Sequence, residues 1–398
     1  MPRARYFAAA DWPQWRGPNR DAKVTGFEAP ATWPKELTKK WKVTIGDGVA
    51  TPALVGDKLY TFSRQGGNEI IRCLNAATGK ELWQDKYPAE PATGAAGGFP
   101  GPRASPAVAD GKVVTFGVDS ALSCYDAASG SKVWRKDSLG DPPQFFVASS
   151  PIIAGGGAAG ERLVIAEYGG GGGGGIVAYD LATGKRKWVW DGDGAAYASP
   201  ELVTAGDTKA ILAETAGNIV AVNLADGKLL WKTPFNSRYN AATPVVDGTT
   251  VFYSGPAKGM TAVAVEKSAD GLAAKELWSN GRTAVQFNSP VVKNGLMYGI
   301  ATGGKLFCLD AKSGTTNWTA DLKAAGRYAD YGSVVDAGAV LFALNPSGEL
   351  VVFAPDGKEF KKVASYKVAD GSTFAYPVIA DKRIFIKDKN DVTLWTIE

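Results

Sequence analysis

Histidine is absent from the 398 residues of this sequence. It is the commonest general base near neutral pH, the commonest transition-metal ligand in proteins and the usual protein ligand of haem. A serine–histidine catalytic arrangement and a histidine-based metal site are therefore excluded. Any catalysis would have to use carboxylates, lysine, tyrosine or a bound cofactor.

The sequence also lacks a strong charge of either sign. Its formal net charge is +4, and lysine and arginine form no long run. Nucleic-acid binding therefore has no electrostatic basis. No run of about 18 apolar residues occurs either, so the sequence predicts no transmembrane helix.

Glycine, by contrast, is abundant. The 49 glycines and 22 prolines are spread along the chain, and 45% of the residues are hydrophobic. This dispersal indicates many tight turns and hence many short strands, and the apolar share is sufficient for a core. The length allows two or three domains, or one large all-β domain.

One phrase of eight residues recurs along the chain and always ends in tryptophan. It reads AATGKELW at 76–83, AASGSKVW at 127–134, LATGKRKW at 181–188, LADGKLLW at 224–231 and AKSGTTNW at 311–318. A glycine stands four residues before each tryptophan, and an aspartate or asparagine stands eight residues before it. The Asp or Asn side chain can open a turn, and glycine supplies the left-handed conformation that closes it. We therefore interpret the phrase as a β-hairpin whose tryptophan packs between neighbouring units.

A serine or threonine followed by proline marks the beginning of each unit. The pairs are Thr51-Pro52, Ser105-Pro106, Ser150-Pro151, Ser199-Pro200, Thr243-Pro244 and Ser289-Pro290, with Ser333-Val334 and Tyr376-Pro377 as weaker copies. These eight starts are 43–54 residues apart, and each unit contains four strand-like runs. Because the hydroxyl residues are periodic rather than singular, we interpret them as small structural positions near an axis and not as catalytic serines.

The eighth unit ends after its third strand, and residues 39–43 (KKWKV) form an isolated strand pattern ahead of the first unit. If this strand completes the last unit, the chain closes into a ring and hides its sheet edges. The sequence therefore predicts an all-β fold, an eight-bladed β-propeller of four-stranded antiparallel blades with almost no helix. Residues 39–398 would form this single propeller domain, and residues 1–38 an extended N-terminal segment.

The segment before the propeller contains Trp12, Trp15 and Trp33 among prolines, a composition that resists both helix and strand. We expect residues 11–37 to lie extended across the propeller, with a partner-docking arm as the alternative. The first ten residues, MPRARYFAAA, are either a trimmed export signal or a frayed terminus.

The repeat, written A/L-x-(T/S/D)-G-K-x-x-W after a strand that ends in Asp or Asn, resembles the repeat of quinoprotein (PQQ-type) propellers. The resemblance covers residues 39–398. The stretch DWPQWRGPNRD at 11–21 is similar to the start of exported bacterial PQQ-like repeat proteins related to outer-membrane assembly propellers. The resemblance implies a periplasmic or otherwise exported protein, and we expect a monomer.

This resemblance points to two different activities. Quinoprotein alcohol dehydrogenases bind PQQ and calcium at the ring centre, with an aspartate base and a disulfide between adjacent cysteines. Propellers of outer-membrane protein assembly lipoproteins have eight blades, bind protein partners and use no cofactor. The present sequence has neither a pair of adjacent cysteines nor a lipobox cysteine near its start.

We therefore expect a non-enzymatic exported scaffold that binds a protein partner or a small ligand at the channel mouth. One alternative is a small PQQ-dependent alcohol or sugar dehydrogenase, with PQQ and calcium as its cofactors. In it, Arg103 would pair with cofactor carboxylates and Asp330 would act as the base. A second alternative is a carbohydrate-binding module. Outside the dehydrogenase alternative we assign no catalytic residue, and we assign no metal site.

The residues just upstream of the unit starts differ between units, and variation inside a repeat is where a binding site can be placed. We expect them to surround one mouth of the central channel. The candidate ligand-binding residues are Arg103, Tyr197, Asn240, Phe287, Asn288, Asp330, Tyr331 and Phe374. Such an aromatic rim suits an anionic planar ligand, a sugar or a peptide, or it surrounds a water-filled funnel without a ligand.

The three cysteines occupy one position of the repeat, which alanine fills in other units. They are Cys73, Cys124 and Cys308. A position that accepts alanine or cysteine is small and buried, so we predict free buried thiols.

A run of glycines at 169–175 precedes a strand rather than a helix. We therefore predict a flexible hairpin loop and not a phosphate cradle. The glycine-rich stretch at 155–160 is interpreted as a similar turn. Glu167 and Glu214 could supply oxygens to calcium, but ordinary surface charges are the simpler interpretation.

Overall fold

The computed structural model describes residues 11–155, 161–170, 173–269, 271–322 and 328–398. The interpretation made for residues 1–10 and that made for residues 156–160 of the turn at 155–160 fall outside these ranges and stay predictions.

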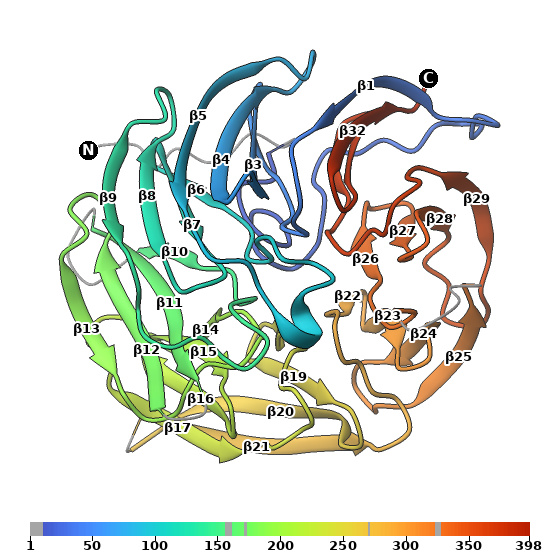
Figure 1. The fold of residues 1–398 in the computed structure, drawn as a ribbon. Helices are drawn as coiled ribbons and strands as arrows, with labels where there is room; N and C mark the ends of the chain where they lie inside the picture. Colours follow the sequence, from blue (N-terminus) through green and yellow to red (C-terminus); the bar gives the residue numbers. More distant parts are fainter. Residues whose placement is uncertain (1–10, 156–160, 171–172, 270, 323–327) are drawn as a thin grey trace.

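Eight four-stranded antiparallel sheets surround a central axis, which confirms the eight-bladed propeller (Figure 1). In seven blades the four strands are consecutive in the chain. Blade 1 contains β2 (Ala53–Val55), β3 (Lys58–Gln65), β4 (Asn68–Asn75) and β5 (Glu81–Pro88). Blade 2 contains β6 (Ala107–Ala109), β7 (Lys112–Phe116), β8 (Leu122–Asp126) and β9 (Lys132–Lys136). Blade 3 contains β10 (Ile152–Gly155), β11 (Arg162–Gly170), β12 (Gly173–Asp180) and β13 (Arg186–Trp190). Blade 4 contains β14 (Glu201–Ala205), β15 (Thr208–Glu214), β16 (Asn218–Asn223) and β17 (Leu229–Pro234).

The second half of the ring repeats this plan. Blade 5 contains β18 (Val245–Asp247), β19 (Thr250–Gly255), β20 (Gly259–Ser268) and β21 (Gly271–Asn280). Blade 6 contains β22 (Val291–Lys293), β23 (Leu296–Ala301), β24 (Lys305–Asp310) and β25 (Thr316–Asp321). Blade 7 contains β26 (Ser333–Asp336), β27 (Leu341–Leu344), β28 (Glu349–Phe353) and β29 (Lys362–Lys367). Blade 8 contains β30 (Val378–Ala380), β31 (Arg383–Lys387), β32 (Asp391–Thr396) and β1 (Thr38–Thr44).

The ring closes where the sequence predicts. Strand β1 pairs antiparallel with β32, and Trp41 lies opposite Leu394. The two ends of the chain therefore share one sheet, so the last blade has its fourth strand although the chain supplies it from the other end.

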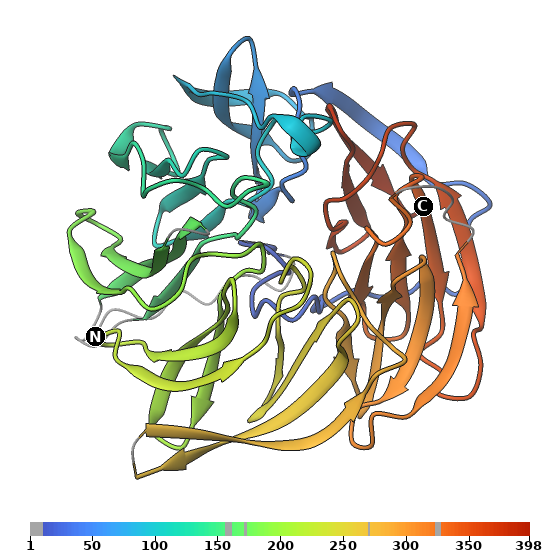
Figure 2. The same ribbon diagram turned by 60° about the horizontal axis from the view of Figure 1, so that its bottom comes forward.

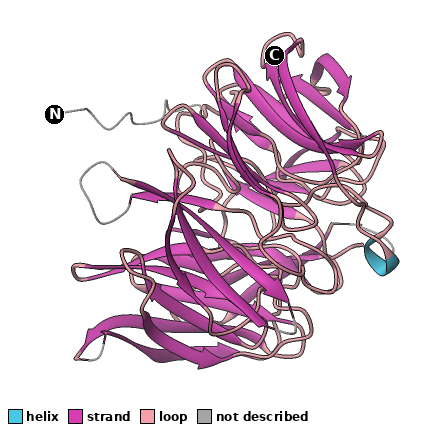
Figure 3. Cartoon of the chain, turned by 60° about the vertical axis from the view of Figure 1, so that its left-hand side comes forward, coloured by secondary structure: helices cyan, strands magenta, loops and turns pink. Residues whose placement is uncertain are grey.

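Helix is nearly absent, as expected. Within the described ranges the one helical element is the single 3-10 turn η1 (Gly94–Ala96), which stands out among the strands in Figure 3. It belongs to the connection between β5 and β6, which leans toward the ring centre (Figure 1).

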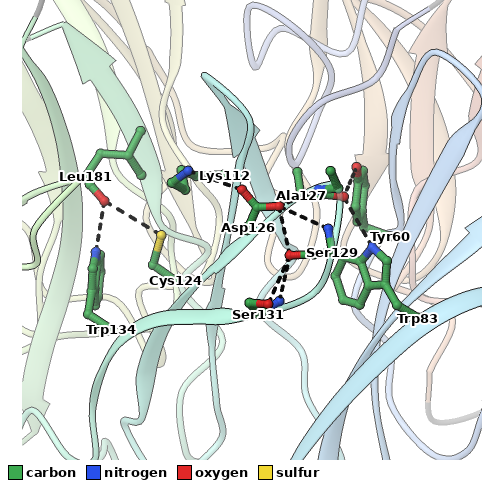
Figure 4. Close-up of polar contacts among 11 residues, drawn as sticks. Tyr60, Trp83, Lys112, Cys124, Asp126, Ala127, Ser129, Ser131, Trp134 and Leu181 are labelled. Carbon is green, nitrogen blue, oxygen red and sulfur yellow. Dashed lines mark hydrogen bonds and ion pairs between the residues drawn. The ribbon is translucent and has the colours of Figure 1, made fainter.

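The repeated phrase forms the hairpin between the third and fourth strands of a blade. In blade 2, Oδ1 of Asp126 accepts hydrogen bonds from the backbone N–H groups of Ala128 and Ser129 at 3.1 and 3.0 Å (Figure 4). Gly130 follows with a φ of +76°, a conformation that costs other L-residues about 1–2 kcal/mol. Asn75, Asp180, Asn223 and Asp310 make the corresponding turn contacts in other blades.

Each hairpin glycine also receives the tryptophan of the preceding blade. Nε1 of Trp83 donates to the carbonyl O of Ala127 at 3.2 Å, so the indole spans from blade 1 to blade 2 (Figure 4). A Cβ on Gly130 would lie 2.5 Å from the Trp83 ring, and glycine is therefore needed for this close approach as well as for its φ. The same contact joins Trp41 to Gly79, Trp134 to Gly184, Trp188 to Gly227 and Trp278 to Gly314. The predicted packing of tryptophans between blades is confirmed.

The N-terminal segment lies across the propeller. Trp12 forms an antiparallel bridge with Leu54 of blade 1, and the N–H of Val24 donates to the carbonyl O of Asp336 of blade 7 at 2.8 Å. Trp12 is only 1% exposed. Figure 2 shows this dark-blue segment near the centre of the ring. The first part of the segment is thus buried against the propeller, as Trp12, Arg16, Arg20 and Ala22 show, and does not project as an arm.

The glycine run is only partly a loop, since five of its seven glycines belong to strands and residues 171–172 lie outside the described ranges. Gly169 and Gly170 end β11, and Gly173 and Gly174 begin β12, where the two pairs lie opposite each other in the antiparallel ladder. The expected hairpin between the second and third strands is present, but these glycines extend its strands. Glycine fits here because side chains would meet neighbouring backbone, as a Cβ on Gly170 would meet the carbonyl O of Pro142 at 2.8 Å.

The contact between Trp83 and Gly130 can be tested with two glycine substitutions in one blade. Gly111 has a φ of +70°, and a Cβ added to it would meet no atom within 4 Å. Gly130 has a similar φ, but a Cβ there would lie 2.5 Å from the Trp83 ring. We expect Gly111→Ala to cost about 1–2 kcal/mol through backbone strain. Gly130→Ala should cost about 1–3 kcal/mol more through overpacking. Urea denaturation of both variants measures the difference, and equal losses would contradict the packing role.

Candidate functional site

A cavity of about 620 Å³ lies on the propeller axis. Its wall includes the hydroxyl residues that begin five blades. They are Thr51, Ser105, Ser150, Ser199 and Thr243. These residues stand just before the innermost strands, so the periodic landmarks of the sequence converge on the axis as expected.

The same hydroxyl residues are joined from blade to blade by hydrogen bonds. The backbone N–H of each residue donates to the side-chain oxygen of the next blade's residue. The donor–acceptor pairs are Thr51–Ser105 (3.0 Å), Ser105–Ser150 (2.9 Å), Ser150–Ser199 (2.9 Å), Ser199–Thr243 (2.8 Å) and Tyr376–Thr51 (3.0 Å). A small side chain with one oxygen satisfies a buried N–H where no sheet partner is available. Their predicted structural role is confirmed.

The N-terminal segment closes one end of the cavity. Trp15 lines the cavity, and its ring meets Tyr376 edge-on with 5.8 Å between ring centroids. The guanidinium carbons of Arg16 and Arg20 lie 5.5 and 5.3 Å from the Trp15 ring centroid. Because the segment also contacts blades 1, 4 and 7, on opposite sides of the ring, it crosses the axis. The cavity is therefore a cup with Trp15 in its floor.

Two buried arginines hold this floor in place. Nη2 of Arg16 donates to the carbonyl O of Pro290 at 2.7 Å. Nε of Arg20 lies 3.3 Å from Oε1 of Glu201, with both side chains less than one tenth exposed. Burial lowers the pKa of Arg20, while its pairing with Glu201 acts in the opposite direction. Removing one partner of such a buried ion pair strongly destabilises the folded protein, because the other charge stays buried without a partner.

Aromatic side chains surround the rest of the cup. The aromatic collar consists of Phe99, Phe145, Tyr197, Tyr239, Phe287, Tyr328, Tyr331 and Phe374. Its neighbouring ring centroids are 4.1–6.0 Å apart, and Phe287 stacks on Tyr331 at 4.1 Å with an interplanar angle of 11°. Such contacts add about 0.5–1.5 kcal/mol per pair beyond their buried area. The collar is therefore a packed wall.

Three charged side chains line the cup within the described part of the chain. Nη2 of Arg103 donates to the carbonyl oxygens of Ala96 and Phe99 at 3.3 and 3.0 Å. Its Nη1 is buried and has no hydrogen-bond partner among the residues that the structure describes. Burial lowers the pKa of Arg103. Arg238 lies over the Tyr239 ring, and Oδ1 of Asp330 accepts from the N–H of Gly303 at 2.6 Å.

The structure brings together six of the eight candidate residues. Arg103, Tyr197, Phe287, Asp330, Tyr331 and Phe374 line the cavity. Asn240 and Asn288 do not line it. Nδ2 of Asn240 donates to Thr215 O at 2.7 Å, and Nδ2 of Asn288 donates to Ile300 O at 2.7 Å. Their amides hold loops behind the collar, because buried backbone carbonyls there need donors.

Several lining residues were missed from the sequence. They are Trp15, Phe99, Phe145, Arg238, Tyr239 and Tyr328. All stand outside the repeat phrases, in connections of unequal length or in the N-terminal segment. Periodicity assigns no position to such residues, and only an excess of aromatic residues in the connections could have indicated them.

The surface interpretation of Glu167 and Glu214 is wrong. They are 1% and 0% exposed. Burial raises the pKa of both carboxyl groups well above the usual value, and the charge of Glu167 raises the pKa of Glu214 further. Oε2 of Glu167 and both Oε atoms of Glu214 are without a hydrogen-bond partner among the described residues. Neither residue lines the cup.

The three cysteines are free and buried, as predicted. Burial raises the pKa of the Cys73 and Cys124 thiols to about 12, and that of Cys308 to about 11. They are therefore protonated and unreactive at neutral pH.

The residues of the cup do not fit a complete PQQ and calcium pair. A planar anion could bind with its charge on Arg103 and its plane against the aromatic collar. Calcium, however, requires about six to eight oxygen ligands. No group of three or more cysteine, aspartate or glutamate side chains that could hold a metal ion occurs in the described part of the chain. The carboxylate of Asp330 is also bonded to the N–H of Gly303.

This chain is similar in sequence to a known protein family and to individual members of it. The sequence model of the family described as outer membrane protein assembly factor BamB matches residues 23–189 and 67–320. Outer membrane protein assembly factor BamB of Burkholderia pseudomallei is 23% identical over 312 residues. That match spans 76% of this chain but only 64% of the relative's length.

Solved structures share the fold. BamB from Moraxella catarrhalis has a TM-score of 0.64 at 14% identity, covering 90% of this chain and 99% of that one. Quinohemoprotein alcohol dehydrogenase from Comamonas testosteroni has a TM-score of 0.72 at 15% identity, covering 98% and 81%. At such identities the likeness concerns the fold alone. No helix in the described residues is long and apolar enough to span a membrane.

The buried carboxyl of Glu214 predicts a pH-dependent stability. Because its pKa is raised in the folded state, this state keeps a proton that the unfolded chain releases above about pH 4.5. Stability contributed by this group is complete below that pH and is lost as the pH rises toward the folded pKa. We expect Glu214→Gln to reduce the fall in urea midpoint between about pH 5 and pH 8. Glu266→Gln, at an exposed residue, is the control and should keep the wild-type slope.

Proposed function

The chain belongs to the family described as outer membrane protein assembly factor BamB, whose repeats are of the PQQ type, and from this membership we propose that it is a protein-binding scaffold of the bacterial cell envelope. The observation that carries the proposal is the family match across residues 23–320. The protein would work outside the cytoplasm and take part in outer-membrane protein assembly. Because the match covers less than two thirds of the Burkholderia relative, this role is inferred from shared repeats.

The geometry of the cup supports a binding role. Aromatic residues and arginine are the types that dominate binding energy at protein interfaces. The cup combines the aromatic collar with Arg103 and Arg238 at one face of the ring. The hydroxyl hydrogen bonds and the floor fix the positions of its wall, so a partner would meet a preorganised surface.

A small PQQ-dependent alcohol or sugar dehydrogenase is the second candidate function. The buried Nη1 of Arg103 favours it, because this nitrogen can donate to a carboxylate of a ligand. The engaged carboxylate of Asp330 and the poor fit to calcium count against it. The scaffold is therefore preferred. The carbohydrate-binding alternative stays a prediction that rests on the collar.

The scaffold role predicts a defect in the outer membrane. In a bacterium that carries this protein, deletion of its gene should lower the amounts of outer-membrane proteins, because a scaffold of their assembly is missing. Quantitative mass spectrometry of isolated outer membranes measures this, and expression of the wild-type chain should restore the amounts. Unchanged outer-membrane proteins in the deletion strain would contradict the proposal.

The scaffold and the dehydrogenase proposals predict different effects of PQQ and calcium on the Tm of the purified chain. A ligand of the folded state at about 100 times its Kd adds about 2.7 kcal/mol of stability. Under the scaffold proposal, PQQ with calcium should leave the Tm of the purified chain unchanged. A rise in Tm that disappears in Arg103→Gln, together with dye reduction by an alcohol, would favour the dehydrogenase.

A further inference from the structure

We propose that the cup binds the C-terminal end of an extended polypeptide, with its α-carboxylate on Arg103 and an aromatic final side chain against the aromatic collar. This inference rests on the proposed scaffold function and names the part of a protein partner that enters the site. It follows from three properties of the cup: a closed floor, an unpaired guanidinium nitrogen and an aromatic wall.

The closed floor favours a chain end over a continuous chain. Trp15 lines the cavity at its floor, and Arg16 and Arg20 pack on its ring. A segment that had to enter and leave would need an open channel or a wide groove. The volume of about 620 Å³ lies within the range of about 300–1,000 Å³ that is usual for small-ligand pockets. The cup therefore admits a chain end of a few residues and not a folded domain.

Arg103 supplies the group that recognises a terminal carboxylate. Its Nη2 is bonded to two carbonyl oxygens of the connection between β5 and β6, which fixes the guanidinium. Nη1 is left without a partner among the described residues, and a buried donor without a partner costs about 1–3 kcal/mol. A carboxylate oxygen would remove this cost with a charge-assisted hydrogen bond.

The protein's own carboxylates near Arg103 are engaged elsewhere. Oδ1 of Asp47 accepts from the N–H of Gly101 at 3.2 Å, and Oδ2 lies 3.4 Å from Nζ of Lys389. Oε1 of Glu69 accepts from the N–H of Val118 at 2.8 Å. Among the described residues, the lining contributes Arg103 and Arg238 against the carboxylate of Asp330, which leaves an excess of one positive charge. An anion complements this charge, whereas an N-terminal amine would be repelled.

The collar specifies the side chain that accompanies the carboxylate. Phenylalanine, tyrosine or tryptophan at the end of a peptide would meet ring edges and faces on several sides, and aromatic pairs are favourable beyond simple burial. Capture of a C-terminal carboxylate is an established mode of peptide recognition. The combination of an α-carboxylate with an aromatic side chain on the same residue is found only at a chain end.

Fluorescence anisotropy with short labelled peptides tests the inference on the full chain. A peptide that ends in phenylalanine with a free carboxylate should bind saturably. The same peptide with a C-terminal amide should bind about tenfold more weakly or worse, because the charge-assisted hydrogen bond is lost. A free-acid peptide with alanine in place of the terminal phenylalanine should also bind more weakly. Equal binding of the acid and the amide would overturn the inference.

Protein variants locate the site. Arg103→Gln should abolish the preference for the acid over the amide, whereas Arg186→Gln, at an exposed residue of β13, should keep it. Since Arg103 also braces a connection, Tyr239→Ala serves as a second variant, and it should weaken both peptides while keeping the preference. The Tm of each variant verifies folding. A preference that persists in folded Arg103→Gln, or full affinity in Tyr239→Ala, contradicts the site.

The outcome separates this inference from the proposed function. If no peptide binds while gene deletion still lowers outer-membrane proteins, the scaffold role holds and the chain-end site is wrong. If peptides bind with the expected preference while outer-membrane proteins are unchanged, the site holds and the assembly role is wrong.

Discussion

The packing of a tryptophan on the next blade's hairpin glycine, which Trp41, Trp83, Trp134, Trp188 and Trp278 make, is the interaction on which the ring depends. Trp83 on Gly130 shows its components: an indole N–H that donates to the following blade, and a ring that covers a residue without a side chain. Each blade is a small sheet that cannot bury both faces alone, so its stability comes from its neighbours. The cup exists only when the eight blades close into a ring, which β1 completes by pairing with β32.

The ring closes in blade 8, and between blades 7 and 8 other contacts replace the packing of a tryptophan on a hairpin glycine. Blade 8 receives its outer strand from the other end of the chain, so it has no hairpin between its third and fourth strands. Blade 7 correspondingly has no tryptophan on β29, because Ala364 pairs with Val352 at the position where Trp83 pairs with Cys73 in blade 1. Phe27 and Trp33 of the N-terminal segment pack on Phe342, and the hydroxyl of Tyr366 donates to Pro34 O at 2.9 Å. The segment thus seals the junction that the repeat leaves open, and it also provides the floor of the cup.

Buried polar groups are concentrated near the axis. Arg16, Arg20 and Glu201 form the base, Arg103 reaches the cup, and Glu167 and Glu214 lie in adjacent blades. Burial of such groups is costly unless they are paired, as Arg20 and Glu201 are. Of these groups, Arg103 is the one whose side chain lines the cavity, whereas Glu167 and Glu214 do not line it.

The amino-acid sequence by itself determined the blade count, the hairpins, the closing strand and the role of the periodic hydroxyls, because each depends on local turn chemistry or on a repeat period. It also placed Arg103, Tyr197, Phe287, Asp330, Tyr331 and Phe374 at one mouth, because they lie just upstream of the unit starts. Only the tertiary structure decided that Asn240 and Asn288 turn to backbone carbonyls and that Glu167 and Glu214 are buried. The same is true of Trp15 in the floor and of the missed collar residues. These features depend on the paths of irregular connections and on contacts between distant segments. The period of the sequence repeat contains no information about either.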